Sequence, residues 1–403
     1  MRKYLSLVLM VVFAATAMAQ QTILVTVENP TSVLRTDQPV VIPLSNDGQV
    51  QSALVKAGDE EIPCQLDDLD QNDCFDELCF LADLKAKEKK QFSVTLYAEG
   101  EPRQYPARVY ADLLMRNSKV KEKNKHNNFL ESITARGDCA DPYHILHHHG
   151  VDFESELNGI RIYFDKRQTI DLYGKFQKRL ELEATQFYTT KEQKAEGYGD
   201  DVLWVGNTFG LGAFRGWDGQ QPTMIEPVRS RTQRIISYGP LRTIVELFDR
   251  GWQIGQQKVN MTVRYTQYAG HRDTDVDVFF NQSVARQLFS TGIINVKDSE
   301  EYSDHHGLRG CWGTDWPSND HENFKPETVG LGICIPMQYV KSEEPANKDN
   351  YGFVVGTPDR HLSYKIIYCS ANESFGYHSA KEWFSFLQNW KQSEVEQPIR
   401  VSY

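Results

Sequence analysis

Alternation between apolar and polar residues recurs along most of the chain. It is clear over residues 160–165, 180–185 and 273–280, where the two kinds of side chain take turns. This period of two predicts β-strands with one face on a core and the other in solvent. Because the pattern repeats between residues 107 and 378, we predict a mostly β fold with a large antiparallel sandwich of two curved sheets. The polar face of such a sheet can form a sugar cleft.

Residues 20–105 are predicted to form a smaller immunoglobulin-like β-domain. Short strand-like runs are separated there by turn signals. The runs are Thr22–Val27, Val40–Leu44 and Gln91–Tyr97. The segment Glu99–Pro106, with two prolines and a glycine, is the expected linker. Residues 106–403 then form the β-supersandwich domain with the cleft.

A different period marks the C-terminal part of the chain. Residues 379–382 read Ser-Ala-Lys-Glu, which is a capping-box sequence for the start of a helix. Trp383, Phe386, Leu387 and Trp390 then fall on one helical face. We predict a C-terminal helix that packs against the large domain.

The first nineteen residues are typical of an export signal. Arg2 and Lys3 precede an apolar stretch over residues 5–14, and Ala17-Met18-Ala19 is a small-residue cleavage site. No later run is long and apolar enough to cross a bilayer. We therefore expect residues 1–19 to be a cleaved signal peptide and the product to be periplasmic or secreted.

The net charge of the chain limits the classes of molecule that it is expected to bind. The formal net charge is -11, and loss of Arg2 and Lys3 would make it more negative by two. Nucleic-acid binding depends on phosphate neutralisation, so this balance argues against it. A local basic cleft on an acidic protein can still bind an acidic oligosaccharide.

The seven cysteines do not indicate a zinc site. Their number is odd, so at least one is unpaired or joins another chain. Export would permit disulfides, and a pair among Cys64, Cys74 and Cys79 is one interpretation. Cys334 and Cys369 lie in apolar runs and are expected to be small buried hydrophobes.

A dense cluster of histidines and a tyrosine is the strongest candidate site. Tyr143, His144, His147, His148 and His149 fall within seven residues. Histidine exchanges protons near neutral pH, which makes the cluster a candidate for acid–base chemistry. If the segment is a strand, His147 and His149 share a face with Tyr143, and His144 and His148 share the other. The alternative is a polar strand edge without chemistry.

A set of basic residues is the second candidate. The arginine guanidinium binds a carboxylate or sulfate through two parallel hydrogen bonds. The set comprises Arg161, Lys166, Arg167, Arg229, Arg231 and Arg234. Arg161 shares the polar face of its strand with Tyr163. It can alternatively be a surface cation paired with Glu154 or Glu156.

Two tryptophans and a row of aspartates complete the sugar-related candidates. Trp204 and Trp217 flank a glycine-rich run that lacks the lysine of a phosphate loop. Their indoles can stack on sugar rings or belong to the core. Asp273, Asp275 and Asp277 lie on one strand face. They can supply carboxylates for glycoside hydrolysis or form a solvated face, and we favour the latter.

One further cluster has the residue types of a metal site. Residues 304–306 read Asp-His-His, and Asp315, His321 and Glu322 follow. Their spacing matches no standard zinc or calcium pattern, so a loop lining the cleft is an equal interpretation. We expect no cofactor and no metal, with a divalent metal as the alternative.

Three segments of the chain resemble a known protein family. They read HHHGVDFESELNGIRIYFDKRQTIDLYGK, GDDVLWVGNTFGLGAFRGWDG and ISYGPLRTIVELFDRGW. The chain resembles the domain-of-unknown-function family DUF4861 of exported proteins over nearly all of its expected mature length. The resemblance implies a fold like the large β-sandwich of polysaccharide lyases. It also implies a place in polysaccharide-utilisation loci for pectin- or ulvan-type glycans, beside enzymes that remove unsaturated uronic acids.

Together these observations predict β-elimination on a uronic acid, by a lyase or an oligosaccharide dehydratase. A base removes the proton at C5, the group on C4 leaves, and a 4,5-unsaturated uronate remains. We expect His147 or His149 as base, Tyr163 or Tyr143 as acid, and Arg161 with Lys166 as neutralisers of the carboxylate. The other expected substrate-binding residues are His148, Trp204, Trp217, Arg229 and Arg231. The alternatives are a binding protein without turnover and a glycoside hydrolase with paired aspartates.

Overall fold

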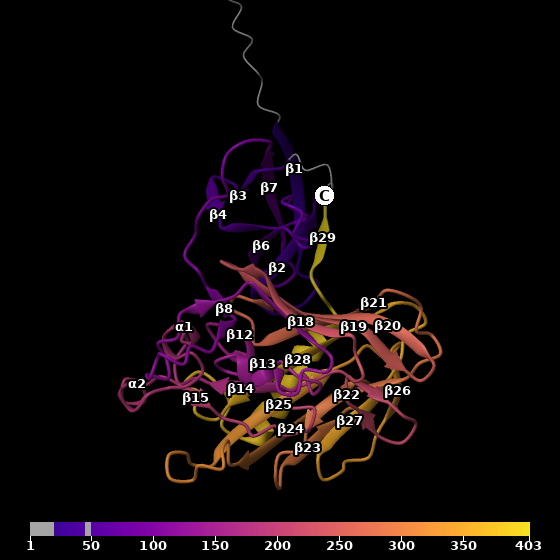
Figure 1. Cartoon of the computed structure of the whole chain (residues 1–403). Helices are drawn as coiled ribbons and strands as arrows, with labels where there is room; N and C mark the ends of the chain where they lie inside the picture. Colours follow the sequence, from indigo (N-terminus) through magenta and orange to yellow (C-terminus); the bar gives the residue numbers. More distant parts are fainter. Residues whose placement is uncertain (1–19, 45–49) are drawn as a thin grey trace, which may run out of the picture.

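The computed structural model describes residues 20–44 and 50–403, so the expected signal peptide lies outside the described residues. These residues form a small lobe and a large lobe, both built mainly of antiparallel strands (Figure 1). The predicted mostly β fold with a C-terminal helix is confirmed. Within the described part, no helix combines the length and apolar character that a membrane crossing requires.

The small lobe is a sandwich of two sheets. The first has the order β29-β1-β7-β3-β4, and the second has the order β2-β6-β5. The strands are β1 (Gln20–Glu28), β2 (Arg35–Pro43), β3 (Ser52–Ala57), β4 (Glu60–Ile62), β5 (Cys64–Asp67), β6 (Glu77–Leu84), β7 (Lys89–Tyr97) and β29 (Arg400–Ser402). Val25, Val40, Phe80 and Phe92 come from both sheets and share one core, as the alternating pattern predicts.

The last strand of the chain returns to the small lobe. β29 pairs with β1 in antiparallel register, with Glu28 opposite Arg400. Figure 1 shows β29 beside β1 in the small lobe. The predicted division at residue 105 placed this strand in the large domain, and the structure differs from it there.

The large lobe is organised around a nine-stranded sheet. The order is β11-β18-β19-β20-β21-β28-β25-β24-β23. The strands are β11 (Ser132–Arg136), β18 (Ser230–Tyr238), β19 (Arg242–Ile254), β20 (Gln257–Tyr268), β21 (Asp273–Phe280), β23 (Glu300–Ser303), β24 (Leu308–Asp315), β25 (Glu327–Cys334) and β28 (His361–Ser370). Val276 and Val278 of β21 are buried in the core, whereas Asp275 and Asp277 are partly exposed, as predicted.

Two five-stranded sheets pack on the same core. Their orders are β15-β14-β13-β12-β8 and β17-β16-β22-β27-β26, and a two-stranded ribbon joins β10 to β9. The strands are β8 (Val109–Asp112), β9 (Leu114–Met115), β10 (Asn128–Phe129), β12 (Gly150–Ser155), β13 (Gly159–Tyr163), β14 (Ile170–Gly174), β15 (Asp200–Asp201), β16 (Arg215–Trp217), β17 (Pro222–Thr223), β22 (Phe289–Ile294), β26 (Val340–Glu343) and β27 (Asn350–Val355). Phe153, Leu172, Phe289 and Phe353 bring the two sheets into one core with Val276.

The C-terminal helix α3 (Ala380–Trp390) forms as predicted. Its N-cap is Ser379, whose hydroxyl accepts a hydrogen bond from the Glu382 amide at 3.3 Å. The Glu382 carboxylate binds the amide of His378 instead of that of Ser379. Trp383 and Leu387 are fully buried against the nine-stranded sheet. A π-turn over Lys391–Val395 follows.

The strand predicted over residues 180–185 is wrong. This segment contains the short helix α1 (Leu182–Thr185), followed by α2 (Lys191–Ala195). The Glu154 carboxylate of β12 accepts from the amides of Glu181 and Leu182 at 2.7 Å each. This distant carboxylate satisfies the free amides at the start of α1, and the local alternation could not reveal it.

The cysteines are free, including the three for which a pair was considered. Cys64 and Cys79 are buried, and Cys74 is partly exposed. Cys334 and Cys369 are buried hydrophobes, as predicted.

Candidate functional site

The polar face of the sheet β15-β14-β13-β12-β8 carries a row of charged residues. Asp152 lies opposite Asp112 on one side and opposite Arg161 on the other, and Arg161 lies opposite Asp171. Neighbours in register on adjacent strands place their side chains on the same face. The other face of the sheet, with Phe153, packs into the core. The sheet thus positions four ionisable groups side by side.

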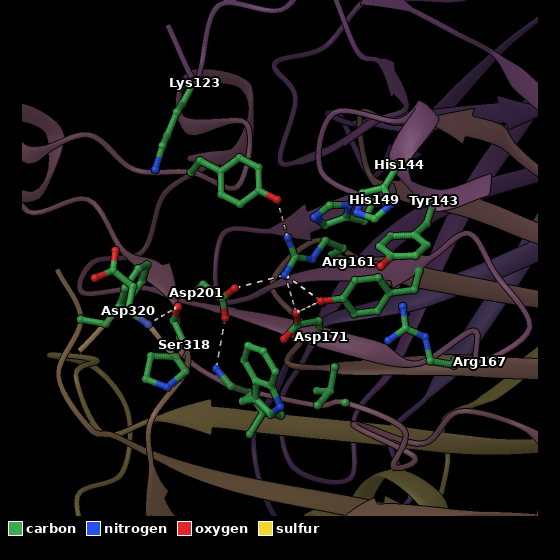
Figure 2. Close-up of a pocket in the computed structure, with 18 residues that line it drawn as sticks. Lys123, Tyr143, His144, His149, Arg161, Arg167, Asp171, Asp201, Ser318 and Asp320 are labelled. Carbon is green, nitrogen blue, oxygen red and sulfur yellow. Dashed lines mark hydrogen bonds and ion pairs between the residues drawn. The ribbon is translucent and has the colours of Figure 1, made fainter. Parts of the chain in front are cut away.

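A cavity of about 440 Å³ opens over this face. Figure 2 shows Arg161, Asp171 and Asp201 together, with Tyr143, His144 and His149 on one side. The remaining lining includes Lys123, Tyr163, Arg167, Tyr188, Trp204, Ser318 and Asp320. Most of the predicted histidine and tyrosine candidates therefore meet in one cavity.

Arg161 holds the centre of this group. Its Nη2 donates to Asp171, to Asp201 at 3.1 Å and to the Tyr163 hydroxyl at 3.2 Å. Its Nη1 donates to the Tyr188 hydroxyl at 3.3 Å. The alternative pairing with Glu154 or Glu156 is wrong. The guanidinium is buried, and both of its terminal nitrogens already donate hydrogen bonds to protein groups. It therefore positions the neighbouring side chains and is not free to bind a substrate carboxylate through two parallel hydrogen bonds.

Two groups that are hydrogen-bonded to Arg161, Asp201 and Tyr163, have raised pKa values. Burial and the charge of Asp171 raise the pKa of Asp201 well above its usual range, although Arg161 opposes this. A protonated Asp201 carboxyl can donate a hydrogen bond. Burial also raises the pKa of Tyr163, whose hydroxyl donates to Asp171 at 3.0 Å. Both pKa shifts favour the protonated form of a group that lies beside the guanidinium.

The histidine segment is not a strand, so the division of its side chains between two strand faces, which was considered for that case, does not apply. A 3₁₀ turn spans Pro142–Ile145, and a tight turn then leads through the three consecutive histidines into β12. His149 has a φ of 71°, in the left-handed region that few side chains adopt. The turn separates His148, which is fully buried, from His147 and His149, which line cavities. His144 lies with Tyr143 instead of with His148, because the two-residue period does not hold.

His149 is in close contact with both candidate tyrosines. Its ring stacks on Tyr163, with centroids 5.9 Å apart, and meets the edge of Tyr143 at 5.1 Å. Burial and the positive charge of Arg161 lower the pKa of His149 to about 4. Within the described residues, His149 Nδ1 has no hydrogen-bond partner.

His147 faces a second cavity of about 580 Å³. Its ring stacks on His126 at 3.8 Å between centroids. Burial and the neighbouring histidines lower its pKa to about 3. Arg116, Lys121 and Lys123 also line this cavity. The two cavities adjoin, because both are lined by Lys123, His149 and Tyr188. The second cavity therefore has three basic side chains in its lining.

Several predicted substrate-binding residues lie outside both cavities. Lys166 is exposed and pairs with Glu226 at 2.9 Å. Arg229 is exposed, and Trp217 is half-buried on β16. Arg231 is buried and donates to Asp249 at 2.9 Å. We expected these four residues to bind substrate, but none of them lines either cavity.

Trp204 is the predicted tryptophan that does line the first cavity. Its side chain is 51 % exposed at the cavity rim. An exposed indole at the mouth of a polar cavity is a platform on which a sugar ring can stack. Arg167, also in the predicted basic set, lines the cavity and pairs with Asp165 at 2.7 Å.

The two acidic clusters considered from sequence do not form sites. Asp304 pairs with Lys391 at 2.6 Å, and His321 stacks on Trp316. Lys365 pairs with Asp273 and Asp275, and His361 lies 2.7 Å from Asp277. The aspartate row of β21 is thus an ion-paired strand face, and Asp273 is buried in it, so the solvated face that we favoured holds only for the partly exposed Asp275 and Asp277.

The sequence reasoning missed Lys123, Asp171, Tyr188 and Asp201. Asp171 was detectable in principle, because it stands between the apolar residues Ile170 and Leu172 on a strand that follows Arg161 closely. Lys123 and Tyr188 come from irregular segments, and Asp201 comes from the two-residue edge strand β15; only the tertiary fold brings them together over the sheet. No spacing rule would have selected them.

Comparison with known proteins gives a family match and distant structural neighbours. The family described as "Domain of unknown function (DUF4861)" matches residues 27–401. No curated protein matches the chain. Two solved structures from Enterococcus faecalis are distantly similar to the chain: a protein in the glycosyl hydrolase family 38 (TM-score 0.49) and an alpha-mannosidase (TM-score 0.47). Each is 9 % identical over 94 % of this chain, which spans 47 % and 46 % of their respective lengths, about half of each.

Proposed function

We propose that this chain, which belongs to the DUF4861 family, is an exported enzyme that processes uronic-acid-containing oligosaccharides by β-elimination. The reaction is that of a lyase when the group leaving C4 is a sugar, and of a dehydratase when it is water. The product in both cases is a 4,5-unsaturated uronate. The expected association of the family with enzymes that remove such uronates supports the proposal.

One observation carries it: an imidazole, a phenol, a carboxyl and an ammonium lie around one guanidinium in one cavity. β-Elimination needs a base for the C5 proton, an acid for the leaving oxygen and a neutraliser for the carboxylate. His149, Tyr163 and Lys123 are the three residues proposed for these roles.

His149 is the proposed base because its ring borders both cavities and contacts the proposed acid. A sugar that spans the junction of the cavities would present its C5 hydrogen to this imidazole. His147 faces only the second cavity, so it is the weaker of the two bases that the sequence suggested.

Tyr163 is the proposed acid. Its hydroxyl donates to Asp171 and accepts from Arg161, so proton loss to the leaving oxygen would give a phenolate beside a guanidinium. Arg161 is therefore a positioning residue for the acid. Tyr143 lies at the cavity wall as an alternative.

The charge of the substrate carboxylate would be neutralised by Lys123 at the border of the two cavities, and the Asp201 carboxyl, whose pKa is raised, would donate a hydrogen bond to it when protonated. A carboxyl kept neutral by burial can donate to an anion, as a charged one cannot. Lys123 takes the role that the sequence suggested for Lys166. Trp204 would hold the neighbouring sugar by stacking.

The test is to incubate the folded protein with uronate oligosaccharides and follow ultraviolet absorbance of the conjugated alkene. Tyr163→Phe and His149→Ala are expected to lose alkene formation by about 10²–10⁴-fold, the usual contribution of general acid–base catalysis. Lys166→Ala, at an exposed cation outside the cavities, is the control and is expected to behave like the wild type. Failure of pectin- and ulvan-type oligosaccharides to give any alkene would count against the proposal.

A second candidate is glycoside hydrolysis, which the paired carboxyls of Asp171 and Asp201 favour. Both accept hydrogen bonds from Arg161 Nη2, which keeps them close together. Retaining hydrolases hold their two carboxyls about 5–5.5 Å apart. Release of reducing sugar without an alkene would support hydrolysis, and saturable binding with neither product would support a binding protein.

A further inference from the structure

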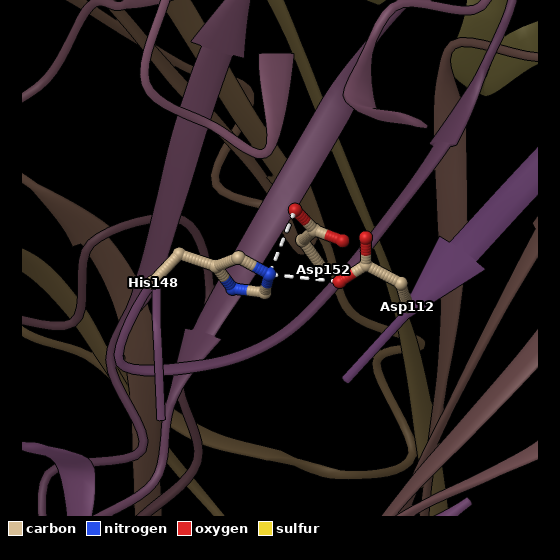
Figure 3. A group of neighbouring side chains, drawn as sticks. All are labelled: Asp112, His148 and Asp152. Atoms are coloured by element: carbon tan, nitrogen blue, oxygen red, sulfur yellow. Dashed lines mark hydrogen bonds and ion pairs between the residues drawn. The ribbon is translucent and has the colours of Figure 1, made fainter. Parts of the chain in front are cut away.

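A buried group of two carboxylates and an imidazole lies beside the cavity. Figure 3 shows the carboxylates of Asp112, from β8, and Asp152, from β12, at the Nε2 edge of the His148 ring. His148 Nε2 lies 2.8 Å from an oxygen of Asp112 and 3.5 Å from an oxygen of Asp152. All three side chains are at most 2 % exposed, and none lines either cavity.

The hydrogen bonding of this group is incomplete. Neither oxygen of Asp152 has a hydrogen-bond partner in the described part of the chain, although the side chain is fully buried. Burial of a carboxylate without compensation costs several kcal/mol, roughly, even after the protein relaxes. The second oxygen of Asp112 accepts from the Tyr110 hydroxyl at 3.0 Å, which fixes the first toward His148.

The charges near the group do not balance either. His148 can carry at most one positive charge for two carboxylates. Arg161 is the next cation along the row, but its hydrogen bonds go to Asp171 and Asp201. The unpartnered oxygens of Asp152 therefore need an additional positive ion or a proton.

We propose that Asp112, His148 and Asp152 bind a divalent transition-metal ion, with Zn²⁺ as the most suitable. One ligand atom from each residue lies within 4.8 Å of the others, so a single ion can reach all three. Imidazole nitrogen together with carboxylate oxygen suits such ions, and Asp152 can supply its second free oxygen as a fourth donor. The Tyr110 hydroxyl is the outer partner that orients Asp112.

The site would be structural and distinct from the proposed catalytic cavity. It would tie the histidine turn to β8 and β12, immediately before His149 with its left-handed φ. The ion would thereby restrain the backbone that presents the imidazoles to both cavities. This inference does not depend on the proposed reaction.

The experiment measures metal content and stability, with no use of substrate. The purified mature protein is depleted with a chelator, loaded with Zn²⁺, passed over a desalting column and analysed by inductively coupled plasma mass spectrometry. We expect one ion per chain, and a melting temperature that falls on chelation and recovers with Zn²⁺. His148→Gln and Asp152→Asn are expected to retain no stoichiometric Zn²⁺, whereas the exposed neighbour variant His144→Gln retains it.

The main competitor is a proton shared between the two carboxyls. In that case folded wild-type protein would retain no Zn²⁺, and Asp152→Asn would be as stable as the wild type. Either result with folded protein overturns the metal proposal. If the variants fail to fold, the wild-type loading and chelation measurements still decide. Zn²⁺ bound to wild type and equally to His148→Gln would also overturn it, because the ion would lie elsewhere.

Discussion

Replacement of Glu154 by glutamine is expected to destabilise the large lobe strongly. The Glu154 carboxylate is fully buried and pairs with the buried ammonium of Lys175 at 2.5 Å. It also accepts from the amides of Glu181 and Leu182. One side chain thus joins β12, the end of β14 and the start of α1, below the segment that carries Tyr188.

The magnitude follows from what the variant leaves behind. Lys175 keeps carbonyl acceptors at Ser155 and Arg179, each 2.7 Å from Nζ, but loses the one ion-pair partner that it has among the described residues. Breaking a buried ion pair from one side typically costs about 3–5 kcal/mol. The total free energy of unfolding of a domain is about 5–15 kcal/mol, so a large share is at stake.

Urea unfolding followed by intrinsic fluorescence measures the effect. Glu183→Gln, an exposed acid within α1, is the matched control and is expected to change the free energy of unfolding by less than about 0.5 kcal/mol. The double variant Glu154→Gln/Lys175→Met is expected to be more stable than Glu154→Gln alone, because no unpaired buried charge remains. A loss below about 1 kcal/mol in Glu154→Gln, or no recovery in the double variant, would refute the reasoning.

Three further predictions concern the cavity, the lobe contact and the histidine turn. Trp204→Ala is expected to raise KM for the oligosaccharide by about tenfold at most, with kcat little changed, because stacking contributes about 0.5–1.5 kcal/mol. Steady-state kinetics measure this, with Trp217→Ala as the control, and a fall in kcat alone would contradict it. His271 contacts Asp273 and the Asp37 carbonyl of the small lobe. Burial and the positive charge of Lys365 lower the pKa of His271, whereas Asp273 and the Asp37 carbonyl raise it. The raising effects are larger, so the pKa of His271 lies above its ordinary value. Its stabilising contribution is therefore complete below the ordinary histidine pKa and lost as pH rises through the folded value. The difference in melting temperature between wild type and His271→Gln should shrink over that rise, and a widening gap would contradict it. Gly150→Ala is expected to lower the free energy of unfolding by more than about 3 kcal/mol, because the added Cβ would lie 1.7 Å from the Ile162 carbonyl oxygen. Gly352→Ala is the control, because its Cβ would have no contact closer than 3.5 Å. Equal melting temperatures for the two variants would show that the turn relaxes to accept the methyl group.

The features that could be predicted from sequence are those set by local periodicity. The alternation in β13 and β21 places the same residues inside and outside as in the structure, because a strand exposes successive side chains to opposite faces. The four aromatic and leucine positions after Ser379 similarly predict α3. Arg161, Tyr163 and Tyr143 were also identified as site residues, and all three line the first cavity.

The errors occur where a distant partner overrides the local pattern. Residues 180–185 alternate like a strand, yet Glu154, from a strand far back in the sequence, caps them as a helix. The histidines resemble a strand edge, yet Asp112 and Asp152 hold His148 inside a turn. In each case a buried carboxylate supplies more free energy than the weak propensity of a few residues.

The amino-acid order alone therefore determines the strands whose alternation no distant partner overrides, such as β13 and β21, and shows that imidazoles, phenols and guanidinium groups are available for chemistry. It leaves open which of these groups meet. Lys123 rather than Lys166 borders the cavity, and Asp201 rather than Glu154 pairs with Arg161, because strand register and loop packing join residues far apart in sequence. Such contacts depend on burial and charge compensation across the whole fold, and no short segment of the chain contains that information.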